Sequence, residues 1–434
     1  MERVAPSQIN YDDQLPIAIS SKSQRREFFP EGGSTYGPNG GTKPNIIRIP
    51  INADSMLDVQ NSYLKFDLKN TSASSATVGV DLPQSFIKRL RILSGGTVLE
   101  DIDQYGRLYA GILYPAQANV GMIGYSNITA GNSIACEDQT WSMKLNGNDR
   151  IATGGSLTFC YHLMSGLLNL DKYVPLVMMN AGFTIELELD NVGSLGICSA
   201  DDKIDWEVSD FRYVAHLIDL ERDFYDRLRM VMEGSGGVLQ LAGQTYRHYS
   251  GQFASAQTKE TINIPARVKS IKSIFFKNTI EADVALYTDY GISSGPTHGL
   301  TEYQFRIGSV VYPPNSVKCS GTNKGEPLNE LEKAFGTLAG FNTSSAILND
   351  QTYLSSANAS AVSGGKPICG AYGLDFESFN RSAIENGVNT ADRSLPITLE
   401  LTASATSVLT TVDVYCLCDA IFYVNLDGTC SVSV

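Results

Sequence analysis

The stretch Phe183-Thr-Ile-Glu-Leu-Glu-Leu-Asp190 alternates between apolar and polar side chains along its whole length. Successive side chains of a β-strand point to opposite faces, so this alternation predicts a strand with one buried face. Its central part, Ile185-Glu-Leu-Glu-Leu189, recurs as Ile397-Thr-Leu-Glu-Leu401. The two copies start 212 residues apart, at positions 185 and 397 of a chain of 434 residues. A strand signature that returns after about half of the chain indicates an internal repeat.

A second pair of markers gives nearly the same offset. Ile49-Pro50 stands near the start of the first half and Ile264-Pro265 near the start of the second, 215 residues apart. Each half also ends in a long apolar stretch, Trp206–Leu217 and Val412–Val424. Because the markers keep the same order in both halves, we interpret the chain as a duplicated β-domain.

Further strands are predicted by shorter alternating runs, at Tyr63–Leu68, Phe211–Leu217 and Tyr303–Ile307. Helices are few and are expected at Glu221–Glu233, at Asn329–Leu338 and, more weakly, at Gln104–Leu113. The first of these helices is followed by Gly234-Ser-Gly-Gly237, which would end it. This helix and its glycine run are the natural boundary between the two halves.

These signals predict an all-β protein of two tandem eight-stranded jelly-roll sandwiches with a few short helices. We expect an extended N-terminal arm at 1–44 and the first jelly roll at 45–220. A linker helix with a glycine-rich turn would follow at 221–237, the second jelly roll at 238–426 and a C-terminal tail at 427–434.

The composition excludes some classes of function. The net charge is −13, so the chain does not carry the broad basic surface of a nucleic-acid binder, and no sequence-specific nucleic-acid binding is expected. The start of the chain has no apolar signal-peptide core, and no apolar run approaches the roughly 18 residues of a membrane span. We therefore expect a soluble chain made in the cytosol.

No motif predicts a catalytic, cofactor or metal site. Gly291-Ile-Ser-Ser-Gly295 matches a nucleophile elbow, but Pro296 and Gly299 follow where that elbow needs a helix. The eight cysteines form no Cys-x-x-Cys pair and have no metal spacing with the four histidines, so buried free thiols are expected. Asp101 and Asp103 could line a cation site, although a helix cap explains them more simply. We expect no enzyme activity and no cofactor.

Several segments resemble a known family. Ile46–Leu68 resembles the opening of the first jelly roll in double jelly-roll major capsid proteins, and Ile92-Leu-Ser-Gly-Gly-Thr-Val-Leu-Glu100 before Tyr105-Gly resembles that family's glycine pair and short helix. Tyr303-Gln-Phe-Arg-Ile-Gly308 and Leu395–Leu401 are similar to capsid proteins of Polinton-like viruses, adintoviruses and virophages. The resemblance covers about residues 45 to 425, in the same order through both halves.

The resemblance implies a structural major capsid protein of an icosahedral double-stranded DNA virus, synthesised in the host cytosol and assembled into the virion. Its partners would be two further copies in a pseudo-hexameric trimer, neighbouring capsomers, a penton protein and minor or cement proteins. The basic residues Lys22, Arg25 and Arg26 are then either part of a solvated tail or an arm that contacts a neighbouring subunit or the particle interior.

Two other classes stay open at this stage. A two-domain β-sandwich spike or a carbohydrate- or receptor-binding module would share the strand pattern, and the loops alone do not exclude it. A two-domain cupin enzyme would need histidine-rich metal spacing inside its barrel, which four scattered histidines do not provide.

Overall fold

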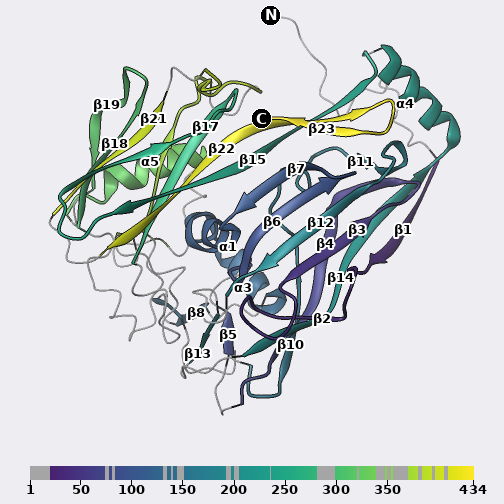
Figure 1. Cartoon of the computed structure of the whole chain (residues 1–434), viewed down its shortest axis with the longest axis horizontal. Helices are drawn as coiled ribbons and strands as arrows, with labels where there is room; N and C mark the ends of the chain where they lie inside the picture. Colours follow the sequence, from purple (N-terminus) through teal and green to yellow (C-terminus); the bar gives the residue numbers. More distant parts are fainter. Residues whose placement is uncertain are drawn as a thin grey trace, which may run out of the picture.

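The computed structural model describes residues 20–73, 78–80, 84–130, 134–137, 140–143, 151–191, 197–199, 205–234, 236–280, 299–319, 322–338, 348, 353–354, 370–379, 384–392, 396–404 and 409–434. Figure 1 shows two β-sandwiches side by side, joined at one end by the helix α4 (Arg222–Gly234). Among the described helices, none is long and apolar enough to cross a membrane.

The first sandwich is built from a six-stranded sheet and a four-stranded sheet, whose main strands have an interleaved order. One layer has the order β1-β14-β4-β10 and the other β3-β12-β6-β7. The strands are β1 (Ser21–Phe28), β3 (Ile46–Ile51), β4 (Met56–Asn70), β6 (Ile87–Ser94), β7 (Thr97–Asp103), β10 (Ser156–Tyr161), β12 (Phe183–Leu189) and β14 (Trp206–Leu220). Every one of these pairings is antiparallel. Eight antiparallel strands in this order form a jelly roll.

The second sandwich repeats that order. Its layers are β15-β22-β17-β20 and β16-β21-β18-β19. The strands are β15 (Val238–Phe253), β16 (Lys259–Ile264), β17 (Ile271–Ile280), β18 (Leu300–Ile307), β19 (Val310–Lys318), β20 (Ala371–Asp375), β21 (Ile397–Ala403) and β22 (Thr410–Asn425). Shorter strands are β2 (Thr35–Tyr36), β5 (Val78–Val80), β8 (Ile134–Glu137), β9 (Thr140–Met143), β11 (Val174–Pro175), β13 (Ile197–Ser199) and β23 (Cys430–Ser433). The predicted fold of two tandem jelly rolls is confirmed.

The sequence repeat corresponds to the same pairing in both jelly rolls. Ile185 of β12 lies opposite Ile49 of β3, and Ile397 of β21 lies opposite Ile264 of β16. All four side chains are fully buried. The two markers that share an offset in the sequence are therefore cross-strand partners, which explains why they recur together.

Each sandwich is filled by aromatic side chains that point inward from both layers. In the first, Phe66 contacts Phe86, Phe159 and Tyr161 edge-to-face and stacks on Phe211. In the second, Phe276 plays the same part and contacts Tyr303, Phe305 and Tyr372. Such ring pairs each add about 0.5–1.5 kcal/mol to the burial of their apolar surface.

The helices lie in matching connections. The chain between β7 and β10 holds α1 (Tyr105–Leu108), the π-helix η2 (Tyr109–Leu113), α2 (Tyr114–Gln117) and α3 (Val120–Thr129), and that between β19 and β20 holds α5 (Gly325–Phe335). All three predicted helices are present with shifted ends. The helix α3 was not predicted, because its sequence Val-Gly-Met-Ile-Gly-Tyr-Ser-Asn-Ile-Thr has two glycines, no charge and no clear apolar stripe.

The described part of the expected N-terminal arm differs from an irregular segment. Ser21–Phe28 forms β1, which pairs with β14 along its full length, so the first jelly roll begins at β1 and not at residue 45. Only Phe28 of this strand is buried, because β1 lies at the edge of its sheet. The expected C-terminal tail likewise contains β23, which pairs with β22.

Candidate functional site

The junction between the two jelly rolls contains the buried carboxylates of Glu100 and Asp413. On one side are β7 and α1 of the first jelly roll, and on the other the outer face of the β15-β22-β17 layer (Figure 1). Residues 412–416 of β22 are buried on both faces of the sheet, because the even-numbered side chains fill the sandwich and the odd-numbered ones meet the first jelly roll. β22 lies between β15 and β17 in its sheet, so it is a central strand that is covered on both sides over these residues.

A buried carboxylate from the first jelly roll receives a hydrogen bond from the second. Glu100 of β7 is 2% exposed and accepts from the Gly166 N–H at 2.8 Å, from the Ser165 hydroxyl and, at 3.5 Å, from the Leu167 N–H. The Thr245 hydroxyl on β15 donates to the same carboxylate at 2.8 Å. Burial raises the pKa of Glu100, and the hydrogen bonds from Ser165, Gly166 and Thr245 oppose that rise.

The two backbones come close beside this carboxylate. A Cβ atom at Gly166 would lie 2.3 Å from the carbonyl oxygen of Gln244, well inside any allowed contact. Gly166 belongs to the first jelly roll and Gln244 to β15 of the second. Only glycine allows this approach, and it brings the donors at Gly166 and Thr245 to the same carboxylate.

A second charged cluster crosses the junction. Arg107 of α1 donates to Asp413 of β22 at 3.0 Å. His248 of β15 contacts the same Asp413 through Nε2 at 2.9 Å, and its Nδ1 lies 3.6 Å from Oδ2 of Asp103 in the first jelly roll. The Tyr415 ring packs on the His248 ring, with centroids 4.9 Å apart. Asp413 is 3% exposed, so its charge depends on these two cationic partners.

The groups of this cluster shift one another's protonation. Burial would raise the pKa of Asp413, but the hydrogen bonds and charges of His248 and Arg107 outweigh it and hold that pKa below its ordinary value. The His248 ring beside it likewise lowers the pKa of Asp103. Burial would lower the pKa of His248, yet Asp103 and Asp413 outweigh burial and raise it. The electrostatics therefore favour charged forms on both sides of the junction.

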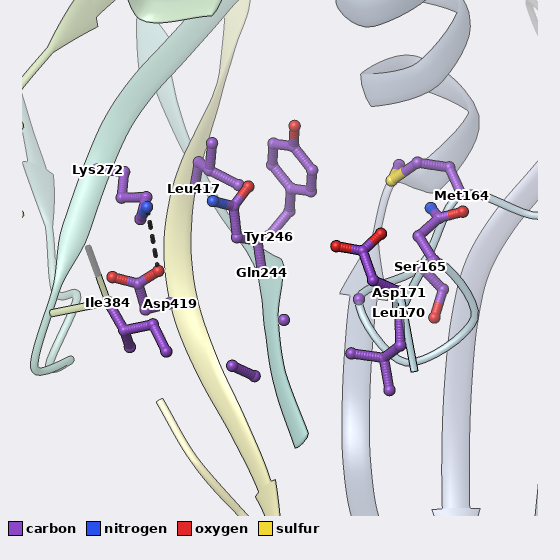
Figure 2. Close-up of a pocket in the computed structure, with 14 residues that line it drawn as sticks. Met164, Ser165, Leu170, Asp171, Gln244, Tyr246, Lys272, Ile384, Leu417 and Asp419 are labelled. Atoms are coloured by element: carbon purple, nitrogen blue, oxygen red, sulfur yellow. Dashed lines mark ion pairs between the residues drawn. The ribbon is translucent and has the colours of Figure 1, made fainter. Parts of the chain in front are cut away.

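A cleft of about 540 Å³ opens next to these clusters. In Figure 2, Met164, Ser165 and Asp171 of the first jelly roll form one wall, and Gln244 and Tyr246 lie on the opposite wall with β22. Lys272 on that wall contacts Asp419 at 3.4 Å and Glu377 at 2.9 Å, and all three side chains are 6% exposed. Within the described residues, no group of three His, Cys, Asp or Glu side chains is placed to hold a metal ion.

The structure places Lys22, Arg25 and Arg26 on β1, where all three are exposed. Arg25 pairs with Glu27 at 2.9 Å, and the Arg26 guanidinium lies 5.0 Å from the centroid of the Phe28 ring. These residues therefore stand on a sheet edge of the first jelly roll, where charge discourages non-specific strand pairing. A role for them in assembly stays a prediction.

The helix-cap interpretation of Asp101 and Asp103 is wrong. Asp101 accepts two hydrogen bonds from Arg89, at 2.6 and 2.7 Å, and Asp103 faces His248, while the N-cap of α1 is Gln104 without a side-chain cap. The elbow-like Gly291–Gly295 and His298 lie outside the described residues. Cys416 and Cys418 are buried free thiols on one face of β22, as expected, whereas Cys160 is a half-buried one.

Four residues that matter most at the junction were not predicted from the sequence, namely Glu100, Arg107, His248 and Asp413. One signal was present, since Asp413, like Asp419, is a charged residue within a mostly apolar strand. A charge inside such a strand needs a partner. The partners lie more than 140 residues away in sequence and could not be named without the fold.

Solved structures share this architecture over nearly the whole chain. A protein of the PBCV-1 virus capsid matches with a TM-score of 0.61 and 12% identity, covering 98% of this chain and 99% of its own. The Faustovirus major capsid protein matches with a TM-score of 0.56, 10% identity and coverages of 95% and 92%. The mavirus major capsid protein matches with a TM-score of 0.54, 11% identity and coverages of 100% and 95%.

The chain has the double jelly-roll fold of viral major capsid proteins. No family model matches the sequence, and no curated protein matches it either. The double jelly roll is therefore recognised through the arrangement of its strands, at identities that show the fold alone. In this chain the junction described above is what joins the two halves of that fold.

Proposed function

We propose that this protein is a structural major capsid protein that builds the icosahedral shell of a double-stranded DNA virus. The observation that carries the proposal is the end-to-end match to capsid proteins, which covers more than nine-tenths of both chains in each case. The proposed location is the virion, after synthesis in the host cytosol.

We further propose that three copies form a ring of six jelly rolls. The junction within one chain joins unlike surfaces, namely β7 with α1 of one jelly roll and the β15-β22-β17 face of the next. The corresponding unused surfaces are β19 of the second jelly roll and the outer β1-β14-β4 face of the first. A contact between unlike surfaces makes a closed ring when it is repeated with a suitable rotation.

The unused face of the first jelly roll carries polar side chains suited to a contact between subunits. Arg25, Glu27, Lys65 and Arg212 share this face, since Lys65 lies opposite Arg212 and the latter donates to Glu27 at 2.7 Å. The equivalent face of the second jelly roll is covered by the first. In this proposal the basic residues of β1 contact a neighbouring subunit, and neighbouring capsomers, a penton protein and minor or cement proteins are the further partners.

The mass of the purified chain in solution tests the ring. Light scattering should give about 141 kDa, three times the 47.0 kDa of one chain. Reversing the charge of the unused face with Arg212→Glu should shift the mass toward that of a monomer, whereas Arg229→Glu on the exposed surface of α4 should leave it unchanged. A wild-type chain that stays at 47.0 kDa under all conditions that give particles would refute the trimer.

A further inference from the structure

His248 lies between two carboxylates that belong to different jelly rolls. Its Nε2 is 2.9 Å from Oδ1 of Asp413 on the neighbouring strand β22, and its Nδ1 is 3.6 Å from Oδ2 of Asp103 at the end of β7. The imidazole side chain is 8% exposed. The ring is thus enclosed in the junction and has an anionic acceptor at each nitrogen.

This geometry distinguishes the two protonation states of the ring. A neutral imidazole has one N–H donor and one lone pair, so it can donate to one carboxylate while its lone pair faces the other. An imidazolium carries an N–H at both nitrogens, so it donates to Asp413 and attracts the nearby Asp103 carboxylate at the same time. The arrangement of acceptors therefore matches the charged ring.

We propose that His248 is a pH-dependent latch between the two jelly rolls, closed when its ring is protonated and loosened when the ring becomes neutral. The closed latch joins Asp103 of the first jelly roll to Asp413 of the second through one cation. The proposal concerns contacts within a single chain and goes beyond the capsid role, because it holds whether or not the chain assembles.

The other charged groups around the ring determine how deprotonation of His248 affects the junction. Arg107 contacts Asp413 from α1, and the buried Lys277 of β17 lies opposite Asp413 on the neighbouring strand. Arg89 of β6 lies opposite Asp103 and is held by Asp101. The Tyr415 hydroxyl donates to the carbonyl of Gln104 at 3.1 Å. When His248 is neutral, Asp413 still has the cationic Arg107 beside it. Among its described contacts, Asp103 then loses the cation that attracts it to the second jelly roll. The junction is then weakened on the Asp103 side while the Arg107 contact persists.

The direction of the pH dependence follows from the same contacts. Asp103 and Asp413 outweigh burial and raise the pKa of His248 above its ordinary value. A group whose pKa is higher in the folded than in the unfolded chain stabilises the fold fully below the unfolded pKa. That contribution is lost as the pH rises through the folded pKa. The latch should therefore be closed at pH values below the raised pKa of His248 and should open as the pH rises through it.

Histidine NMR on the full-length chain tests the protonation directly. The chain has four histidines, and the His248→Gln variant identifies the signal of the latch. We expect His248 to titrate above the value of about 6.5 of an unperturbed imidazole, and to titrate lower in the Asp103→Asn variant. A titration at or below that value in the wild-type chain overturns the proposal.

Amide hydrogen exchange tests the mechanical consequence. After correction for the intrinsic effect of pH, exchange in β7 and in the facing part of β15 should become at least several-fold faster between pH 6 and pH 9 in the wild type. His248→Gln should remove this dependence. His162→Gln should keep it, because His162 contacts Ser62 and Asn169 within the first jelly roll. If the exchange depends on pH equally in the wild type and in His248→Gln, the latch is refuted. If His248→Gln does not fold, the same comparison is made with Asp103→Asn.

Discussion

Thr245→Val isolates the hydrogen bond by which the second jelly roll reaches the buried carboxylate of the first. Valine has nearly the shape of threonine, so the change removes the hydroxyl donor and leaves the packing in place. Thr245 and Glu100 are each 2% exposed, and the hydroxyl donates to the carboxylate at 2.8 Å. Water therefore cannot replace the lost donor without opening the junction.

The expected magnitude follows from the nature of this bond. A hydrogen bond to a charged group contributes about 1.5–3 kcal/mol to stability, against about 0.5–1.5 kcal/mol for a neutral one. Glu100 keeps its donors at Ser165, Gly166 and Leu167 in the variant, so the carboxylate is not left unpaired. We expect Thr245→Val to lower the free energy of unfolding by about 1.5–3 kcal/mol, a large share of the roughly 5–15 kcal/mol of a typical domain.

Equilibrium unfolding in urea provides the assay. The chain concentration must be held constant, because any self-association adds to the apparent stability. Circular dichroism follows both jelly rolls, and fluorescence of the buried Trp206 follows the first. Thr261→Val, at an exposed position of β16, is the matched control and should change stability by less than about 0.5 kcal/mol. A loss in Thr245→Val no larger than in this control would show that the bond across the junction does not stabilise the protein.

Three further changes test other parts of the structure. Gly166→Ala should separate the jelly rolls or prevent folding, because its Cβ would lie 2.3 Å from the Gln244 carbonyl oxygen; a variant with wild-type thermal stability would contradict that close approach. Arg107→Ala should lower the free energy of unfolding in urea by about 3–5 kcal/mol, since it removes one cationic partner of the buried Asp413. A loss below about 1 kcal/mol would argue against the ion pair. Deletion of residues 1–28 should destabilise the first jelly roll more than deletion of residues 1–19, because it removes β1 and the buried Phe28; equal melting temperatures would show that β1 is dispensable.

The sandwich strands could be predicted because their signal is local. Alternation in Phe183–Asp190 reports one buried face directly, and the repeat at 397 extends that inference to a second domain. The edge strand β1 could not be predicted in the same way. Six of its eight residues are exposed, so it lacks an alternating pattern and depends on backbone pairing with β14.

The contacts at the junction could not be predicted from the sequence for a different reason. Glu100 meets Thr245 and Arg107 meets Asp413 only because the second jelly roll docks on one particular side of the first. Strand patterns define each sandwich separately and contain no information about that docking. The charge of Asp413 inside an apolar strand indicated a buried partner, and the fold supplied its identity.

The double burial of β22 has a consequence for how this sequence can change over time. From Val412 to Cys416, one set of side chains fills the second sandwich and the other set contacts the first jelly roll. Every one of these positions is therefore constrained by packing or by a buried charge. Its counterpart β14 has one face open in the single chain, with Arg212 still partly exposed. The two corresponding strands are thus under unequal constraint. In a saturation mutagenesis library selected for folding, β22 should accept fewer substitutions than β14, and the difference should be concentrated on the side chains that face outward from the sandwich.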